Sequence, residues 1–388
     1  MRGQAGLGWL VATGFFLLAL CWSPLLPGLL GLESSVAFLA GFALFTSLVN
    51  GRRGVPVAVA GACAALVLVC LLLFLVTGSK TLLARLVPVP LLVFAAWQAN
   101  SVEGLVERLC DAMSAFCVAG VAMCVVGFVY AYLGGQPVLS IVNNDGRENA
   151  LYLTTMTNFW VGNVIRPSFI YDEPGAFAFM VCATVAMREA LGRPGRLSWL
   201  LILGGLITLS ITHMLVLMMF LVRRIGWART GLVATVLVGG VATLIQTTDE
   251  FDFVADRFTV DDGKLSGDNR SDQVANLLAV ITPEMFLFGD VMCHDRPDRV
   301  CEEHGDISSS PATPVYRGGV VMLATQITVH VALVVAFLRQ RRFRFPALVF
   351  TILLLQRPYF EGYGYGFFTY LLLFHMLAMR RKRTEEAR

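Results

Sequence analysis

Charged residues are scarce in this chain, and their scarcity argues against a soluble fold. Asp, Glu, Lys and Arg make up 15% of the 388 residues, whereas soluble domains average about a quarter. Lysine is nearly absent, because all but three of the 30 basic residues are arginine. The formal net charge is only +3, so the composition indicates no nucleic-acid partner.

The motifs of several common enzyme classes are also missing. The sequence has no Walker A loop, no GxGxxG after a strand, no HExxH and no GxSxG. Nothing therefore indicates nucleotide use or a hydrolase triad, and we expect neither a cofactor nor a metal. No internal repeat or linker is visible, so we expect a single polytopic domain over residues 1–388.

What the chain does have is apolar segments, which recur from end to end. Many are long enough to cross a bilayer, which predicts an all-α, polytopic integral membrane protein. They fall near residues 5–22, 29–49, 55–76, 82–98, 113–133, 174–191, 197–221, 230–247, 315–337, 346–356 and 366–379. The first resembles a signal peptide, but more segments follow at once, so we expect an uncleaved helix.

The segment 197–221 is either one long span or two short legs joined near Ser210. With one span, the two N-terminal basic clusters and the three C-terminal ones lie on opposite faces. With two legs, all five lie on one face, as the positive-inside rule requires. The clusters are Arg52–Arg53, Arg193/Arg196, Arg223/Arg224/Arg229, Arg339/Arg341/Arg342/Arg344 and Arg380–Arg383.

We therefore predict about 12 membrane-crossing segments, including a broken or re-entrant pair, with both termini in the cytoplasm. Such a pair is tolerated only where protein covers it or it lines a wet cavity, which hints at an internal site. Two long loops, 134–173 and 248–314, then lie outside. In the second, Val274, Leu277 and Ile281 follow helical spacing, so we expect a helix in the interface or packed on the bundle.

The two cysteines in the second loop have three interpretations. A disulfide between Cys293 and Cys301 is the first, since the outside of the membrane is oxidising. Zinc binding together with His294 and His304 is the second, although the spacing fits no standard zinc motif. Two free thiols are the third. The other seven cysteines lie in or near apolar segments and are typical of small core residues.

Arginines at the outer helix ends are the main candidates for binding. Arg stays protonated and grips phosphate through two parallel hydrogen bonds, so several arginines facing one cavity suit a pyrophosphate. Arg166, Arg270 and Arg317 each adjoin a helix start or a Gly-rich edge. The alternative for any one of them is solvation or pairing with a nearby acid. His213, at the tip of the two legs, is a weaker candidate.

The stretch IRPSFIYDEPGAF, residues 165–177, gathers charges at the start of an apolar segment. Pro174 suits the first turn of a helix. Asp172 and Glu173 then lie at the helix N-terminus, where negative charge is favoured by about 0.3–1 kcal/mol. This account leaves Arg166 without a reason.

Three segments together resemble the O-antigen polymerase and ligase superfamily of bacterial inner-membrane glycosyltransferases. They read RPSFIYDEPGAFAF, SGDNRSDQVANLLAVITPEMFLFGDV and DISSSPATPVYRGGVVMLATQ, and LITLSITHML is similar to the family's broken segment. The resemblance covers roughly residues 150–335. Ligases typically carry a His-Asn pair where this chain has Ser308–Ser310, with His304 a few positions earlier, so the resemblance leans toward a polymerase.

The resemblance implies transfer of a glycan from undecaprenyl pyrophosphate to the end of another lipid-linked repeat unit, for O-antigen, capsule or exopolysaccharide. Arg166, Arg270 and Arg317 would bind the pyrophosphate. Glu173 is the first candidate for the base, followed by Asp172, His294 and His304. A chain-length regulator and a flippase are candidate partners. The alternatives are ligation of finished polymer to an acceptor, a lipid-linked glycan flippase, and a non-catalytic scaffold.

Overall fold

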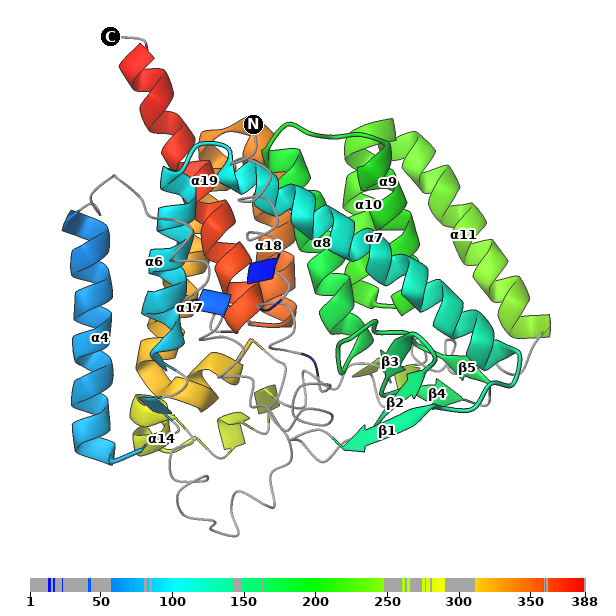
Figure 1. Cartoon of the computed structure of the whole chain (residues 1–388), viewed down its shortest axis with the longest axis horizontal. Helices are drawn as coiled ribbons and strands as arrows, with labels where there is room; N and C mark the ends of the chain where they lie inside the picture. Colours follow the sequence, from blue (N-terminus) through cyan, green and yellow to red (C-terminus); the bar gives the residue numbers. More distant parts are fainter. Residues whose placement is uncertain are drawn as a thin grey trace. The chain divides into compact units, whose positions relative to one another are not determined.

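The chain is mostly helical in the part that the computed structural model describes (Figure 1). The described residues are 13–14, 17, 23, 41–42, 57–79, 82–83, 86–142, 148–161, 163–247, 260–261, 264–265, 274–275, 277–279, 281–289, 311–358, 360 and 362–386. Contacts divide the chain into two compact units. Unit 1 comprises Met1–Leu18, Phe38–Leu109 and Asn269–Arg388, and unit 2 comprises Ala19–Ala37 and Cys110–Asp268.

Three of the described helices are long and apolar enough to cross a membrane, which is compatible with a membrane protein. They contain Ala60–Thr77, Leu105–Tyr132 and Thr313–Arg339. Large apolar side chains on them are exposed, as lipid-facing side chains are, for example Leu75 and Val331. The predicted 12 crossings, the outer position of the loops and the cytoplasmic termini stay predictions.

Unit 1 is built mainly of helices that pack lengthwise. They are α4 (Val57–Thr77), α6 (Pro88–Ser101), α14 (Pro283–Phe288), α17 (Thr313–Arg339), the 3-10 turn η3 (Arg341–Phe343), α18 (Arg344–Gln356) and α19 (Tyr363–Glu386). Asn100 joins α6 to α19, since its Nδ2 donates to the carbonyl of Leu371 at 3.0 Å. Pro88 opens α6 at a position where no helical hydrogen bond is lost.

A kink in α17 brings together parts of two of the motif segments quoted above. These parts are Phe288–Gly289 at the end of α14 and Arg317–Gly319 in α17. Gly319 has φ +59°, and a Cβ there would lie 2.2 Å from the carbonyl oxygen of Leu287. Gly289 has φ +84°, and its Cβ would lie 2.8 Å from the nitrogen of Gly318. Only glycine permits both this backbone conformation and this approach. The two segments are thus held against each other by their backbones.

The helix predicted in the second loop is present where the structure describes it. Residues 274–275 and 277–279 are helical. Leu277 is buried against Val315 of α17, with Ile281 and Met285 packed around them. The apolar stripe therefore packs on the helix bundle of unit 1, which is one of the two arrangements that the spacing predicted.

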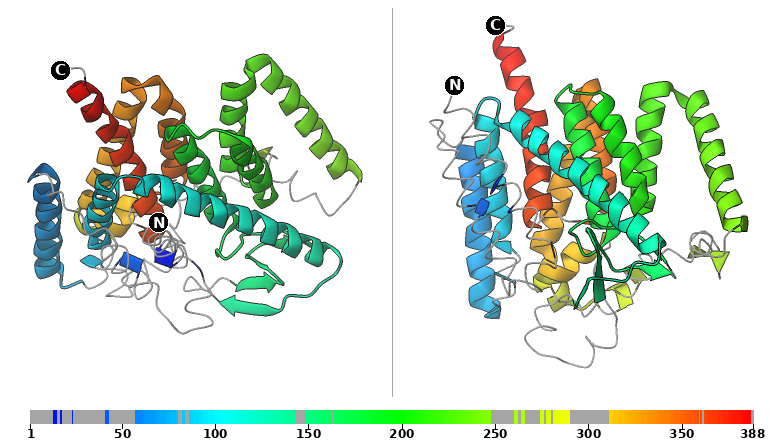
Figure 2. Two further views of the ribbon diagram at one scale, coloured as in Figure 1. Left: turned by 45° about the horizontal axis from the view of Figure 1, so that its top comes forward. Right: turned by 45° about the vertical axis from the view of Figure 1, so that its right-hand side comes forward.

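Unit 2 is organised around one central helix. Its helices are α7 (Leu105–Tyr132, which begins in unit 1), α8 (Pro174–Ala190), α9 (Arg196–Gly204), the 3-10 turn η1 (Gly205–Thr208), α10 (Ile211–Ile225) and α11 (Trp227–Thr247). Nearly every residue of α8 is buried. The two views of Figure 2 show α9 and α10 standing side by side next to α8, and contacts among the three agree. A helix that is apolar on all sides over most of its length fits such a central place.

Short strands, which the sequence did not predict, lie in the predicted loops 134–173 and 248–314 of this mostly helical chain. β1 (Leu139–Val142), β2 (Glu148–Tyr152) and β3 (Thr155–Thr157) form an antiparallel sheet in that order, with Leu139 opposite Leu151. β4 (Trp160–Val161) pairs with β5 (Val164–Ile165), and β6 (Val260–Asp261) pairs with β7 (Lys264–Leu265). Strands of two to five residues carry too few alternations to be recognised by a period of two.

Candidate functional site

The segment 197–221 is broken in the middle, as the two-leg interpretation predicted. The α9 helix gives way to η1, Leu209 adopts φ +49°, and α10 begins after the extended Ser210. Nε of Arg188 donates to Oγ of Ser198 at 3.2 Å, which places the start of α9 beside the end of α8. The last turn of α10 lies at that same end, because Arg223 pairs with Glu189 at 3.3 Å. The two legs thus form a hairpin, and the break is its tip.

Small residues and a buried histidine allow the hairpin tip to pack tightly. A Cβ on Gly205 would lie 2.2 Å from the ring of His213, and one on Gly204 would lie 2.6 Å from Val121 of α7. His213 is fully buried, with Nε2 2.7 Å from the carbonyl of Ile202 and Nδ1 3.3 Å from Sγ of Cys182. Since a carbonyl only accepts, Nε2 carries the proton and donates. His213 is therefore a structural link between both legs and α8, and its full burial does not support it as a candidate for binding.

Arg166 reaches the tip of this hairpin. Its side chain leaves the end of β5, is only 9% exposed, and lies over the ring of Phe159 at 5.4 Å. Nη2 donates to the carbonyl oxygens of Thr208 at 3.3 Å and Leu209 at 3.1 Å. The last carbonyls of a helical leg have no donor within the helix, and a cation there is favoured. Arg166 thus binds the free carbonyl oxygens at the break between the two legs, a contact that the sequence did not reveal.

The turn that follows Arg166 is fixed by hydrogen bonds. Oγ of Ser168 donates to the carbonyl of Met156 at 2.7 Å, and the amide of Phe169 donates to Oγ1 of Thr155 at 2.8 Å. Phe169 itself has φ +60°, a strained conformation for a residue other than glycine. Its ring packs against Phe177 of α8 with centroids 5.5 Å apart. Both neighbours of the turn, β3 and α8, therefore set the position of Arg166.

The two acids of the motif lie where the sequence predicted. Pro174 is the first residue of α8 and Glu173 is its extended N-cap, with Asp172 directly before it. The Glu173 side chain makes no capping hydrogen bond to the helix, and both acids are half-buried. A carboxylate at this place is favoured by the helix dipole. Arg166, Asp172 and Glu173 thus lie in the connection between β5 and α8 of unit 2.

The remaining predicted site residues fall elsewhere. Arg317 lies in unit 1, half-buried in the first turns of α17, immediately before the Gly318–Gly319 kink. The other predicted positions lie outside the described residues, and so does the predicted disulfide; they are Arg270, His294, His304, Cys293 and Cys301. For these residues the roles given above stay predictions.

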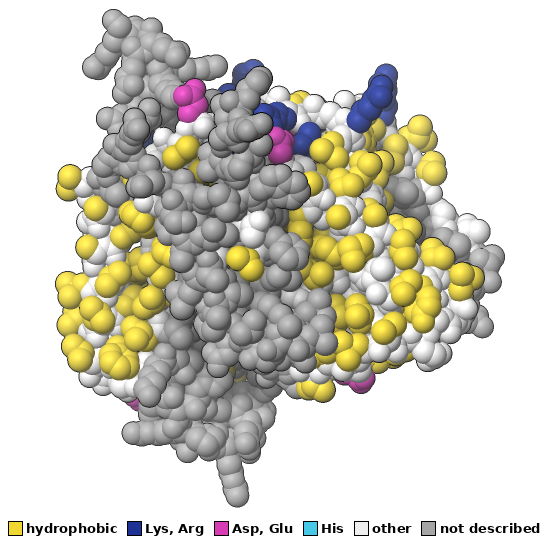
Figure 3. Space-filling model, in the orientation of Figure 1, with side chains coloured by type: hydrophobic (Ala, Val, Ile, Leu, Met, Phe, Trp, Pro, Cys, Tyr) yellow, Lys and Arg dark blue, Asp and Glu magenta, His cyan; other side chains and the backbone are white. Residues whose placement is uncertain are grey.

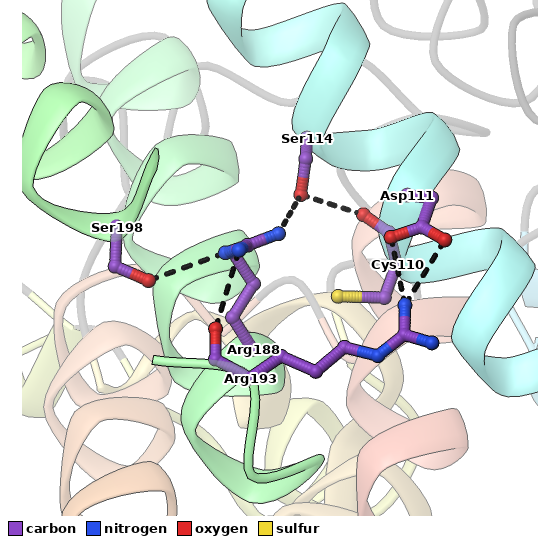
Figure 4. Close-up of polar contacts among 6 residues, drawn as sticks. All are labelled: Cys110, Asp111, Ser114, Arg188, Arg193 and Ser198. Atoms are coloured by element: carbon purple, nitrogen blue, oxygen red, sulfur yellow. Dashed lines mark hydrogen bonds and ion pairs between the residues drawn. The ribbon is translucent and has the colours of Figure 1, made fainter. Parts of the chain in front are cut away.

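The opposite end of α8 holds buried polar contacts that the sequence did not reveal (Figure 4). The guanidinium of Arg188 donates to Ser198, to Oγ of Ser114 at 3.2 Å and to the carbonyl of Arg193 at 3.2 Å. Nη1 of Arg193 in turn donates to both carboxylate oxygens of Asp111, at 2.9 and 3.0 Å. The sequence signals for this cluster are the charged pair Arg188 and Glu189 inside the otherwise apolar segment 174–191 and the basic residue Arg193 that follows it.

A buried carboxylate completes that end. The side chain of Glu189 is 2% exposed and pairs with both Arg223 and Arg224 of α10. Arg224 also lies over the ring of Phe220 at 5.3 Å. Burying a carboxylate is costly unless it is paired and hydrogen-bonded. Two arginines on one acid meet that requirement and fasten the second leg to α8.

Metal chemistry has no support in the described part of the chain. Among those residues, no group of three or more His, Cys, Asp or Glu side chains lies close enough together to hold a metal ion. The described cysteines are free thiols, most of them buried in helices. The described candidate site therefore consists of an arginine, two acids and the backbone of a broken helix pair.

Comparison of the sequence with known proteins adds nothing to this. No protein-family model matches the chain, and no curated protein matches it significantly. The likeness to polysaccharide polymerases therefore rests on the motifs described above. Function has to be argued from the residues themselves.

Proposed function

We propose that the protein is a membrane-embedded polysaccharide polymerase of the bacterial inner membrane. It transfers a growing glycan from one polyprenyl pyrophosphate to the terminal sugar of another lipid-linked repeat unit. The resemblance of three segments suggests this class, and the geometry around Arg166 supports it. Both termini lie in the cytoplasm in this proposal, and the loops 134–173 and 248–314 face outward.

The observation that carries the proposal is a buried arginine at the tip of a broken helix pair. A break in a membrane helix is tolerated where protein covers it or where it lines a polar cavity. Broken helices with inward-facing termini form substrate sites in many membrane proteins. Arg166 brings a permanent positive charge to this break, and its two hydrogen bonds to Thr208 and Leu209 both use Nη2. The guanidinium carries five N–H donors in a fixed fork whose shape suits a phosphate.

The proposed reaction needs charge stabilisation more than acid catalysis. The acceptor hydroxyl oxygen bonds to the anomeric carbon while the bond from that carbon to the pyrophosphate oxygen breaks. The hydroxyl proton passes to a base, and the pyrophosphate leaves as an anion. Positively charged donors held in place before reaction stabilise the charge that develops on the leaving group. Arg166, Arg270 and Arg317 fill this role in the proposal.

Glu173 is the proposed base. It lies seven residues after Arg166, at the far side of the same fixed turn. Its side chain makes no capping hydrogen bond to α8. A carboxylate that accepts the hydroxyl proton in the transition state contributes typically about 10²–10⁴-fold in rate. Asp172, His294 and His304 are the other candidates.

The experiment is glycan-ladder formation in cells that carry the full-length protein with single substitutions. Arg166→Ala, Arg270→Ala and Arg317→Ala should each abolish long chains. Arg339→Ala, an exposed arginine at the end of α17, serves as the matched control and should give a normal ladder. Because Arg166→Ala also removes a contact at the hairpin tip, Arg166→Lys is included. Lysine keeps the charge but loses the two-pronged geometry.

Two results separate function from folding. We expect Arg166→Lys to elute from size exclusion like the wild type while chain growth falls by at least about tenfold, since Arg and Lys are not interchangeable at a two-pronged phosphate site. Long ladders from both Arg166→Ala and Arg317→Ala would overturn the proposal. Full-length polymer that stays on the polyprenyl carrier, with only the attachment to an acceptor missing, would point to a ligase instead.

A further inference from the structure

The helix ends near Glu189 gather arginines on one edge of unit 2. The start of α9 lies there through the Arg188–Ser198 contact, and the end of α10 lies there through Glu189. The α11 helix begins one residue later, after Gly226. We define the arginine edge as Arg193, Arg196, Arg223, Arg224 and Arg229. Figure 3 shows dark-blue side chains above the ends of α9 and α10, with yellow apolar side chains on the helices below.

Acids neutralise only part of this edge. Glu189 pairs with Arg223 and Arg224, and Asp111 pairs with Arg193. Arg196 and Arg229 are exposed and form no ion pair within the described part of the chain. Among the described residues, positive charge therefore remains in excess at this end, where a partner with negative charge can bind it.

The two arginines without an acid stand at unfavourable places in their helices. Arg196 is the first residue of α9, and Arg229 lies in the first turn of α11. A helix N-terminus carries partial positive charge, so a cation there is disfavoured and an anion is favoured. Neither helix has an acidic residue in its first turn. Residues that break a local rule without compensation inside the fold are expected at functional places.

The side chains around the arginine edge indicate its position relative to the membrane. Trp227, the first residue of α11, is 81% exposed between Arg224 and Arg229. Below it, Leu232 is 67% exposed and Val236 is 66% exposed. An apolar band that ends in an exposed tryptophan and arginines is the pattern of a membrane–water interface. The edge thus sits where phospholipid headgroups are.

We infer that the arginine edge binds the headgroup phosphates of anionic phospholipids. Arginine holds phosphate through two parallel hydrogen bonds, and the open amides at the starts of α9 and α11 favour the same anion. Trp227 lies at the level of the lipid backbone, and Leu232 and Val236 contact the acyl chains. These apolar contacts select a lipid over free phosphate or a soluble polyanion. The inference depends on membrane insertion and not on the polymerase proposal.

Native mass spectrometry of the purified full-length protein tests it. The protein is offered equal amounts of phosphatidylglycerol and phosphatidylcholine with identical acyl chains. The double variant Arg196→Gln/Arg229→Gln removes the two arginines that form no described ion pair. Their removal therefore breaks no described ion pair of the fold. The control Arg339→Gln/Arg341→Gln removes two exposed arginines of unit 1 and causes the same change in net charge.

We expect the wild type to retain phosphatidylglycerol preferentially. The edge variant should lose about tenfold of that retention, because two basic residues that contact the headgroups are removed. The control should lose less than about twofold, because its arginines lie outside the arginine edge. Equal losses in the two variants would show that net charge alone acts, and the inference would be wrong. Unchanged retention in the edge variant would overturn it as well. In a second measurement, the shift in unfolding temperature is compared between inorganic phosphate and phosphatidylglycerol. Equal shifts would also overturn the inference, because the edge would then be a site for free phosphate.

Discussion

Both ends of α8 have arginines and acids nearby, but these side chains bind different partners at the two ends. At the C-terminal end, Arg223 and Arg224 pair with the buried Glu189, and Arg188 is held by serines and a carbonyl. At the N-terminal end, Arg166 binds main-chain carbonyls at a helix break. The Glu173 carboxylate stands at the helix start without capping it.

This difference separates stability from chemistry. Charges that pair with one another at a buried position mainly fasten elements together. Charged side chains that a rigid backbone holds in a fixed position suit a site that binds or activates a substrate. We therefore assign the fastening of the hairpin to the C-terminal end of α8. We assign the proposed reaction to the N-terminal end.

The largest expected effect is on activity, at the N-terminal end. Glu173→Gln keeps the shape of the side chain but removes the base, so chain growth should fall by about 10²–10⁴-fold. Thermal stability should change little, since the lost helix-end charge is worth about 0.3–1 kcal/mol. The rate is measured with purified variant and lipid-linked repeat unit, with Asp172→Asn alongside. A Glu173→Gln protein of normal rate would move the role of base to Asp172, His294 or His304.

The next effect is on stability, at the C-terminal end. Glu189→Gln leaves two arginines without their shared acid and should lower the free energy of unfolding by about 3 kcal/mol, the low end for a buried pair. We use the low end because both arginines keep contact with water. Unfolding in detergent is followed by intrinsic fluorescence. The rate per folded molecule should stay unchanged, and a selective loss of rate would contradict the division of roles between the two ends.

A third prediction concerns the hairpin tip between those ends. Gly205→Ala would place a Cβ against the ring of His213, and overpacking of this kind typically costs about 1–3 kcal/mol. Gly231→Ala in α11 meets no atom within 4 Å. It should be neutral or stabilise by up to about 1 kcal/mol, since alanine is the better helix former. Thermal shifts of both variants give the comparison, and an equal response would show that the tip is not tightly packed.

The smallest effect is expected for the exposed ion pair. The Arg193 and Asp111 side chains are 41% and 59% exposed, and pairs of this kind contribute about 0–1 kcal/mol. Asp111→Asn should therefore shift the unfolding midpoint far less than Glu189→Gln does, and added salt should reduce its effect further. A loss as large as that of Glu189→Gln would mean that burial does not distinguish the two clusters.

Much of this fold follows from periodic apolar segments and helix-end chemistry. The segment predicted at 174–191 matches α8 to within a residue, because Pro174 fixes its start. The break near Ser210 followed from the placement of basic clusters alone, and the helices confirm it. The helix around Leu277 followed from its apolar stripe. In each case a local pattern was sufficient.

What could not be predicted depends on contacts between distant parts of the chain. Arg166 and Leu209 are 43 positions apart, and no local pattern pairs a guanidinium with the carbonyls of a later helix break. The strands β1 to β5 are too short for a periodic signal. The burial of Glu189 depends on two arginines more than 30 positions away. The interlocked glycines at 289 and 319 were visible as motifs, but their contact was not.

One measurement addresses the central claim directly. The purified full-length protein is reconstituted in liposomes with a polyprenyl-pyrophosphate-linked repeat unit as the only substrate, without nucleotide or ion gradient. We predict a ladder of longer lipid-linked glycans, together with release of free polyprenyl pyrophosphate. The same liposomes with Arg166→Lys should extend the glycans at least about tenfold more slowly. Repeat units that cross the bilayer without growing, or that stay unchanged beside a correctly folded protein, would contradict the account.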